Sequence, residues 1–301
     1  MPARHAARDL TELREALRSL RVSLRSRRRV GALDAVLLRA SGPSAALATL
    51  HFPRWAEEWC GQRLTRAERT QLQAVQAHLL AWIVLRDGIA DGDSGTLGNL
   101  PDLMPLLFEA QHRLGLLFGP GDPFWGDYRC LVRQQVGADR WERAPPVHAR
   151  FNHILVTRLG RKAALLRWPA GAVARRLCRP SSVKEIDSAF DDLLAALQLF
   201  DDILDVEEDA AAGQVNAVLV AGGAVGSIDP MRLQEHIEAG ISPVYTAARS
   251  RLLRLTRCRG GIGAFSRSLL AGSVDGERRA LEVARNRRAG AFLAQLLARP
   301  Q

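Results

Sequence analysis

From position 198 to position 209 the chain reads Gln-Leu-Phe-Asp-Asp-Ile-Leu-Asp-Val-Glu-Glu-Asp, an acidic segment set among apolar residues. On a helix, at about 100° per residue, six of its polar side chains fall within roughly one third of the circumference. These polar residues are Gln198, Asp201, Asp202, Asp205, Glu208 and Asp209. Because like charges at i,i+4 destabilise a helix, so many carboxylates on one stripe require counter-charges.

Apolar residues lead into this stripe, from Leu193 to Phe200, and indicate that it lies inside a helical bundle. Buried carboxylates need compensation, and divalent cations such as Mg²⁺ supply it. A solvated acidic face on the outside of the molecule is the alternative, and this helix alone leaves it open. A second acidic cluster favours the buried interpretation.

That second cluster, Asp87-Gly-Ile-Ala-Asp91-Gly-Asp93, stands at the end of a helix predicted over residues 66–89. Asp87 and Asp91 are one helical turn apart and point the same way. A calcium loop would need further ligands and a closing glutamate, which are missing here. Two carboxylate pairs on facing helices could instead hold Mg²⁺ ions that join the protein to a substrate phosphate.

The composition favours an all-α globular protein. Of the 301 residues 47% are hydrophobic and 25% charged, and only two are tyrosine. The net charge of +10 fits a diphosphate, a nucleic acid or an acidic membrane surface without selecting among them. Because the arginine-rich N-terminus lacks aromatic residues and a second basic surface, we expect no nucleic-acid partner.

Several features predict a cytoplasmic protein without a transmembrane segment. The four cysteines are widely spaced, which disfavours a zinc site or a disulfide framework and indicates free thiols. The N-terminus carries Asp9, Glu12 and Glu15 and has no apolar core, so it does not resemble a signal peptide. The apolar runs of the sequence are too short to cross a bilayer.

We expect residues 1–50 to form a basic helix or arm that packs on the bundle, and residues 51–301 to form the bundle. Thr65 and Glu68 have the spacing of a capping box at the start of a helix. Beyond the helix over 66–89, helices are predicted around Trp55 and Trp59, over 103–117, over 124–143, over 149–179 with a kink at Pro169, over 183–212, and twice at the C-terminal end. Residues 213–230 are predicted to form a loop.

Gln198-x-x-Asp201-Asp202-x-x-Asp205 resembles the second aspartate-rich motif of the class I isoprenoid synthases. The likeness is greatest to the trans-prenyl diphosphate synthases, in which this motif has the form Q-x-x-D-D-x-x-D. The resemblance covers roughly residues 70–215, and the second motif is its most specific part.

Three further segments extend the resemblance. Asp87-Gly-Ile-Ala-Asp91 is similar to the first motif of the family, D-D-x-x-D, with Asp93 just beyond it. Lys162 stands where the family often has a lysine at a similar distance before the second motif. Arg158 precedes Lys162 by one helical turn.

The resemblance implies an all-α bundle around an apolar pocket, with two acidic patches that bind three Mg²⁺ and the diphosphate of an allylic prenyl substrate of C10 to C20. The implied metal ligands are Asp87, Asp91, Asp201, Asp205 and Asp209. The implied catalytic set is Asp87, Asp91, Asp201, Asp202 and Asp205, and the implied diphosphate or metal-shell residues are Arg158, Lys162 and Gln198. The sequence leaves the oligomeric state open, a homodimer included.

Departures from the family pattern limit which of the family's reactions we expect. Gly88 replaces the second aspartate of the first motif, and Ser94-Gly95-Thr96 replaces the paired arginines of chain-elongating enzymes. Gln214 stands at the position of a further lysine after the second motif. In the family these missing groups bind a second diphosphate substrate. The N-D-x-x-S-x-x-x-E motif of most terpene synthases is also absent.

We therefore expect a class I terpene synthase that ionises an allylic prenyl diphosphate and cyclises or quenches the carbocation. Three alternatives remain. They are a prenyltransferase that joins prenyl units, a non-catalytic homologue that serves as a partner subunit, and a helical binding protein whose acidic stripe faces solvent.

Overall fold

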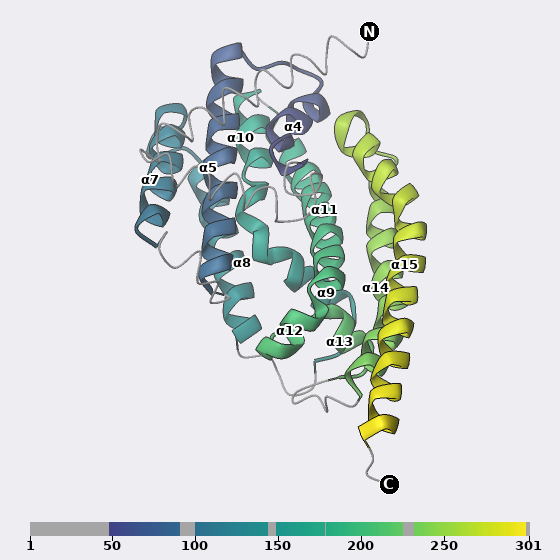
Figure 1. Ribbon diagram of the computed structural model, residues 1–301. Helices are drawn as coiled ribbons and strands as arrows, with labels where there is room; N and C mark the ends of the chain where they lie inside the picture. The colour runs from purple at the N-terminus through teal and green to yellow at the C-terminus, as the bar shows by residue number, and fades with distance from the viewer. Residues whose placement is uncertain (1–47, 91–99, 144–148, 178, 225–231, 299–301) are drawn as a thin grey trace. The chain divides into compact units, whose positions relative to one another are not determined.

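The computed structural model describes residues 48–90, 100–143, 149–177, 179–224 and 232–298. Throughout these ranges every regular element is a helix, which confirms the predicted all-α class. The chain divides into two compact units (Figure 1): Met1–Arg133 with Ala163–Phe190, and Gln134–Lys162 with Asp191–Gln301. The predicted basic arm and the glycine-rich segment that contains Asp91 lie almost wholly outside the described residues.

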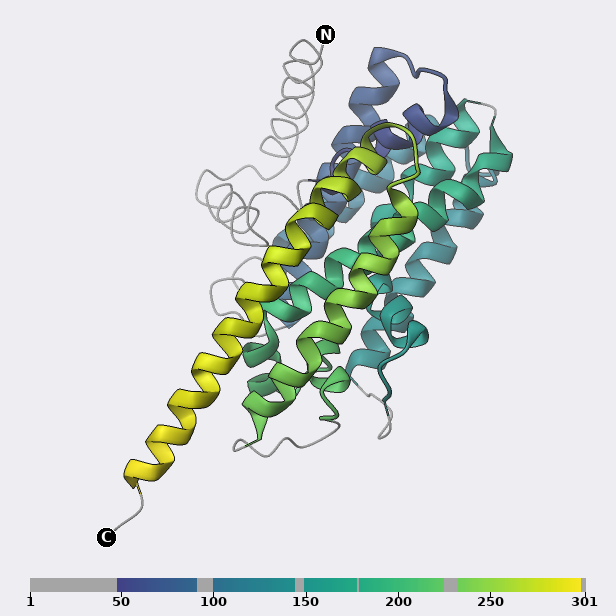
Figure 2. The same cartoon turned by 90° about the vertical axis from the view of Figure 1, so that its right-hand side faces the viewer.

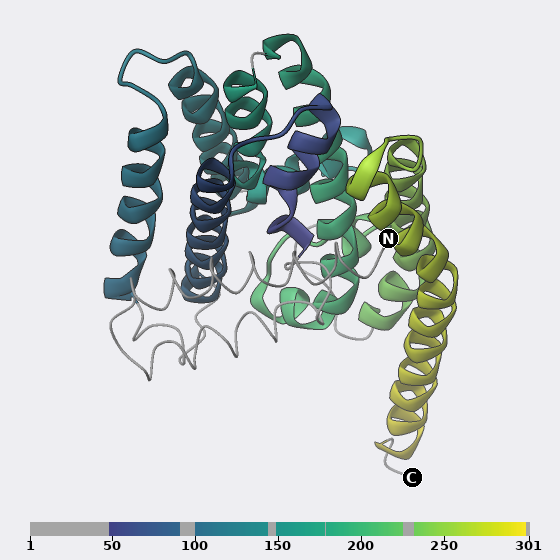
Figure 3. The same cartoon turned by 90° about the horizontal axis from the view of Figure 1, so that it is seen from above.

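The first unit is built on two long helices that lie side by side, α5 and α7 (Figures 1 and 3). Its helices are α4 (Phe52–Cys60), α5 (Arg66–Ala90), α7 (Leu100–Leu117), α10 (Pro169–Arg176), the 3₁₀ segment η3 (Pro180–Ser182) and the first parts of α8 (Phe124–Arg143) and α11 (Val183–Leu204). The capping box forms as predicted, because the Thr65 N–H donates to Glu68 and the Glu68 N–H donates to Thr65 Oγ1. The observed ranges of α5, α7 and α8 confirm the helices predicted over 66–89, 103–117 and 124–143.

A buried glutamine connects the segments of this unit. Gln76 of α5 is fully buried, and its amide nitrogen donates to the carbonyls of Thr49 (3.0 Å) and Leu166 (3.3 Å). Its amide oxygen accepts a hydrogen bond of 2.6 Å from the Trp168 indole. Because a buried amide must be paired, these bonds fix the chain around Leu166 against α5. Phe52 of α4 stacks on Phe190 of α11 at 4.2 Å between ring centroids.

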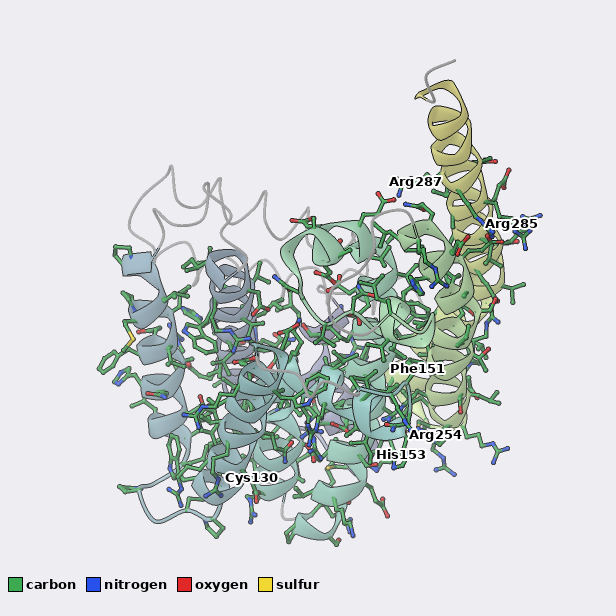
Figure 4. All side chains as sticks on the ribbon, turned by 90° about the horizontal axis from the view of Figure 1, so that it is seen from below. Cys130, Phe151, His153, Arg254, Arg285 and Arg287 are labelled. Carbon is green, nitrogen blue, oxygen red and sulfur yellow. The ribbon has the colours of Figure 1, made fainter. Side chains whose placement is uncertain are left out.

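The second unit contains a long antiparallel hairpin of two helices, α14 (Leu233–Leu255) and α15 (Gly260–Ala298), shown in Figure 2. Its other helices are α9 (His153–Gly160), α12 (Val206–Ala212), α13 (Ala217–Ala221) and the second parts of α8 and α11. Arg285 and Arg287 lie on opposite sides of α15 (Figure 4). Arg285 pairs with Glu238 of α14 at 3.0 Å, and Arg287 pairs with Glu207 of α12 at 2.6 Å.

Three sequence-based predictions of secondary structure are wrong in detail. The helix predicted over 149–179 is divided into α9, the 3₁₀ segment η2 (Arg161–Arg167) and α10, with a non-helical backbone at Ala163 (φ −110°, ψ 22°). Pro169 begins α10, where a proline is favoured, and does not kink a continuous helix. The helix predicted over 183–212 is interrupted at Asp205, and the loop predicted over 213–230 contains α13.

None of the described helices combines the length and the apolar character that a membrane span requires.

Candidate functional site

Four aspartates gather in the second unit where α11 ends and α12 begins, and we call this group the acidic junction: Asp201, Asp202, Asp205 and Asp209. In a continuous helix, three of them, spaced at i, i+4 and i+8, would lie above one another and repel. The backbone departs from helical geometry at Asp205 (φ −100°, ψ 8°), which occupies the N-cap position of α12 without a side-chain capping bond, and Gly213 ends α12 in the left-handed conformation (φ 67°). The Asp205 N–H still donates to the Asp201 carbonyl (3.0 Å) and the Asp209 N–H to the Asp205 carbonyl (2.9 Å), and the charges of Asp205 and Asp209 raise the pKa of Asp201.

The four carboxylates differ in exposure. Asp202 is buried, Asp201 and Asp209 are partly buried, and Asp205 is exposed, as is the neighbouring Glu208. The expectation of a uniformly buried acidic stripe is therefore wrong for Asp205 and Glu208, because the break at Asp205 turns this part of the chain outward.

Asp202 is bound on both carboxylate oxygens by the protein itself. Gln198 Nε2 donates to Oδ1 (2.9 Å), and the backbone N–H of Ala217 donates to Oδ2 (2.8 Å). Burial raises the pKa of Asp202 to about 6, although the Gln198 hydrogen bond opposes this shift. Because one oxygen accepts a hydrogen bond from the first residue of α13 and the other from the side chain of Gln198, Asp202 connects α11 to α13. With both oxygens bound in this way, it is a poor metal ligand.

Asn216 completes the connection between α11, α12 and α13. Its side chain is buried, and Nδ2 donates to the Asp202 carbonyl (2.6 Å) and to Asp209 Oδ2 (2.7 Å). Its Oδ1 accepts from the N–H of Val218 and so caps α13. Asn216 therefore fixes the position of the Asp209 carboxylate.

The remaining partly buried carboxylates lack sufficient positive charge. Burial and the charges of Asp205 and Asp202 raise the pKa of Asp201 to about 7, and the Lys162 ammonium only partly opposes this. Burial also raises the pKa of Asp209 to about 7, against the opposing effect of its hydrogen bond from Asn216. Such carboxylates hold their protons to near-neutral pH unless a cation neutralises them.

Lys162 provides positive charge to this group and is held by a carboxylate from α8. Its Nζ lies 2.6 Å from Oε1 of Glu142, and the exposed fractions of the two side chains are 22% and 17%. The Lys162 charge lowers the pKa of Asp201, Asp202 and Asp209, while the Glu142 charge raises that of Asp202. Glu142 is thus a fifth carboxylate of the site.

Arg158, the second predicted diphosphate residue, lies on α9 with its guanidinium over the Trp141 ring, 5.4 Å from the centroid. The helix that carries it approaches α11 closely at Gly160. A Cβ at Gly160 would lie 2.7 Å from the Cα of Ala195, so only glycine permits this approach. Arg158 and Lys162 belong to the second unit, as does the segment that resembles the second motif.

The first predicted motif is described only in part. Asp87 lies near the end of α5 in the first unit and forms an ion pair with the adjacent Arg86 at 2.7 Å. Asp91 lies outside the described residues. Leu80 and Ile83, on the same helix, are buried.

The oxygen donors of the acidic junction fit Mg²⁺ in type. Burial raises the pKa values of the Asp201 and Asp209 carboxylates, and a bound cation would favour their ionised forms. Within the described ranges, no three His, Cys, Asp or Glu side chains are already grouped to hold a metal. One or two carboxylates per ion are nevertheless sufficient for Mg²⁺ when phosphate oxygens and water complete its shell.

Comparison with known proteins found no match: no family model, no curated protein and no solved structure matches the chain.

Two residues of the site were not foreseen from the sequence. Asn216 directly precedes the apolar run Ala217–Val220, a signal for a helix cap that was available. Glu142 lies far from the second motif in the chain and carries no local signal, so only the folded structure brings it to Lys162.

Proposed function

We propose that the chain is a Mg²⁺-dependent class I terpene synthase that ionises an allylic prenyl diphosphate and cyclises or quenches the resulting carbocation. One observation carries the proposal: the segment that resembles the second motif forms a group of partly buried carboxylates whose charge the nearby Lys162 does not balance. Divalent cations would neutralise a site of this kind, and an oxygen-rich ligand such as a diphosphate would complete their coordination.

In this proposal each group has a defined task. Asp201, Asp205 and Asp209 hold Mg²⁺, and by the family resemblance Asp87 and Asp91 supply further ligands, for three ions altogether. When bound, these ions stabilise the negative charge that develops on the departing pyrophosphate.

The remaining residues bind the diphosphate or position its ligands. Lys162 and Arg158 bind diphosphate oxygens, since an ammonium and a guanidinium both suit phosphate. Gln198 and Asn216 hold Asp202 and Asp209 in place.

The missing phosphate-binding groups favour one diphosphate substrate over two. Ser94 and Thr96 stand in place of paired arginines, and Gln214 in place of a lysine. A prenyltransferase that joins prenyl units is the second candidate, because Gln198, Asp201, Asp202 and Asp205 match the motif of those enzymes in full. Gly88 also leaves open a non-catalytic homologue that acts through a partner subunit.

The proposal includes the setting of the enzyme. Under this proposal the fold is the isoprenoid synthase type of helical bundle, and the family resemblance assigns the buried residues Leu80 and Ile83 to the wall of an apolar pocket for a C10 to C20 chain. The pocket would exclude water from the carbocation. We place the enzyme in the cytoplasm, where the free thiols Cys60, Cys130 and Cys258 remain reduced, and include a homodimer among its assemblies.

Product analysis tests this function. The full-length protein is incubated with Mg²⁺ and C10, C15 or C20 allylic diphosphates, each with and without isopentenyl diphosphate, and the products are identified by gas chromatography–mass spectrometry. We expect a hydrocarbon or alcohol without isopentenyl diphosphate, lost in Asp201→Asn and retained in Glu208→Gln, which removes an exposed carboxylate of the same segment. Longer diphosphates formed only with isopentenyl diphosphate would establish the prenyltransferase instead. Products retained in Asp201→Asn would contradict the site.

A further inference from the structure

The turn between α14 and α15 is rich in arginine. Between Glu238 and Asp275 the sequence has six arginines and neither aspartate nor glutamate. The Arg267 guanidinium donates to the Thr256 carbonyl (2.7 Å), which holds it at the end of α14. Four of the six arginines are exposed and lie at this end of the hairpin, and we call them the basic turn: Arg254, Arg257, Arg259 and Arg267.

The start of α9 adjoins this surface. Arg251 of α14 donates to Thr157 Oγ1 of α9 (2.9 Å), so the two helices are in contact there. Figure 4 shows His153, the first residue of α9, close to Arg254, and both residues are exposed. Arg251 and Arg254 pair with the same carboxylate, Asp192 of α11, at 2.8 and 2.7 Å. One negative charge therefore compensates two guanidiniums, and the surface keeps an excess of positive charge.

The opposite end of the hairpin has a different charge balance. Arg285 of α15 pairs with Glu238 of α14 (3.0 Å), and Arg288 pairs with Glu238 (3.0 Å) and Glu235 (3.4 Å). Carboxylates thus compensate the arginines at that end. An arginine-rich composition by itself would charge both ends alike, so the excess at the basic turn is a local feature of the sequence.

Two large aliphatic side chains are exposed close to these charges. Leu253 directly precedes Arg254 and is 57% exposed, and Ile154 follows His153 on α9 and is 54% exposed. Arginines attract anionic lipid headgroups, and aliphatic side chains gain free energy when they enter the boundary of the acyl region. A single-stranded nucleic acid would instead stack its bases on aromatic side chains. The combination of arginine with leucine and isoleucine therefore favours a membrane surface.

We propose that the basic turn, together with Leu253 and Ile154, binds the surface of an anionic phospholipid bilayer. The guanidiniums bind headgroup phosphates, which suit their planar array of donors, and the two aliphatic side chains enter the boundary of the acyl region. This interaction is peripheral and spans no bilayer. The inference goes beyond the proposed function and does not depend on it, because it uses no residue of the acidic junction.

Vesicle sedimentation with the full-length protein tests the proposal. The vesicles consist of phosphatidylcholine alone or of phosphatidylcholine and phosphatidylglycerol in equal parts, and we expect binding only to the mixed vesicles. Arg257→Gln combined with Arg259→Gln should lower the partition coefficient roughly tenfold or more, because each arginine near an anionic surface strengthens binding. Leu253→Ser, which leaves the charge unchanged, should lower it several-fold, because an apolar side chain no longer enters the bilayer.

The matched control is Arg285→Gln combined with Arg288→Gln, which removes the same charge from the opposite end of the hairpin. Their partner Glu238 lies roughly 24 Å from Arg254 along α14, at 1.5 Å per residue. This separation exceeds the Debye length of about 8 Å at physiological ionic strength, so the control should bind the mixed vesicles as the wild type does. Circular dichroism of each variant establishes that the helices are retained.

Four outcomes would overturn the inference. The wild type does not bind the mixed vesicles, or it binds and the variant at Arg257 and Arg259 binds equally well. The two arginine pairs lose binding alike, in which case the net charge and not the basic turn attracts the protein. Leu253→Ser binds as the wild type does and inorganic phosphate displaces the protein, in which case the basic turn binds free anions and not a bilayer. None of these outcomes bears on the proposed function, which the product analysis tests separately.

Discussion

At the scale of single residues, the four aspartates of the acidic junction differ in how the protein binds their carboxylates. Asp202 is part of the second motif, but both of its carboxylate oxygens accept hydrogen bonds, from Gln198 and from the Ala217 N–H. These bonds connect α13 to α11. Burial raises the pKa values of Asp201 and Asp209, and the Lys162 charge only partly opposes this shift. The sequence predicted all of these residues, but their separate tasks depend on hydrogen bonds to a segment that it assigned to a loop.

The raised pKa of Asp201 predicts how stability depends on pH when no metal is bound. The folded protein keeps the Asp201 proton up to about pH 7, whereas the unfolded chain releases it near pH 3.8. The free energy of unfolding therefore carries a contribution that falls as pH rises from about 4 to 7. Asp201→Asn lacks this contribution, so it should match the wild type at about pH 4 and exceed it by up to about 4 kcal/mol at about pH 8.

Urea unfolding in the presence of a chelator measures both proteins at the two pH values. A stability difference that is the same at both pH values would contradict the shifted pKa of Asp201.

Asn216 makes a second prediction at this scale. Asn216→Ala removes the cap of α13 and two further hydrogen bonds from a buried side chain, and should lower the free energy of unfolding by about 2 kcal/mol. Thr65→Ala, which removes the exposed cap of α5, should cost about 1 kcal/mol and serves as the control. Only Asn216→Ala should also weaken Mg²⁺-dependent pyrophosphate binding, since Asp209 loses its support. Equal binding by both variants would argue against a positioning task for Asn216.

At the scale of elements, the sequence predicted well those helices whose ends are set by local signals such as capping residues and prolines. The Thr65 and Glu68 capping box fixed the start of α5, and Pro123 and Pro145 bracket α8, whose predicted range was correct. The predictions failed where tertiary contacts break a helix. The segment after Gly160 leaves the α-helical path beside α11, and Asp205 does so beside α13, and neither break has a strong signal in single-sequence periodicity.

Alanine substitutions at two glycines on different helices should change the free energy of unfolding in opposite directions. Gly160→Ala places a methyl group 2.7 Å from the Cα of Ala195 and should destabilise the protein by more than about 2 kcal/mol, because α9 must move away from α11. Gly115→Ala meets nothing within 4 Å on α7 and should stabilise by about 0.5–1 kcal/mol through the higher helix propensity of alanine. Urea midpoints of the two variants provide the comparison. Shifts of the same sign would contradict the close packing of α9 on α11.

At the scale of the whole molecule, charge and composition constrain the ligand class more than the reaction. The net charge of +10 favours an anionic ligand, and the acidic junction favours one that arrives with divalent cations. The all-α class followed from composition and helical periodicity. The division of the chain into two compact units did not follow, because it depends on contacts between distant segments.

The net charge predicts a salt dependence for the proposed reaction. Raising NaCl from about 0.05 to 0.5 M shortens the Debye length from over 10 Å to a few ångströms. The kcat/KM for a prenyl diphosphate should then fall several-fold, while kcat changes little, because electrostatic attraction acts on encounter and not on the bound complex. Steady-state assays of pyrophosphate release measure both constants. A kcat/KM that does not respond to salt would exclude a contribution of the net charge to substrate capture.

The most direct test of the account is the binding of pyrophosphate to the full-length protein, measured by isothermal titration calorimetry with and without Mg²⁺. We predict binding only when Mg²⁺ is present, its loss in Asp201→Asn, and its retention in Glu208→Gln, because the acidic junction binds the anion through the metal. Absence of Mg²⁺-dependent binding in the wild type, or undiminished binding in Asp201→Asn, would contradict the assignment of this junction as a metal–diphosphate site.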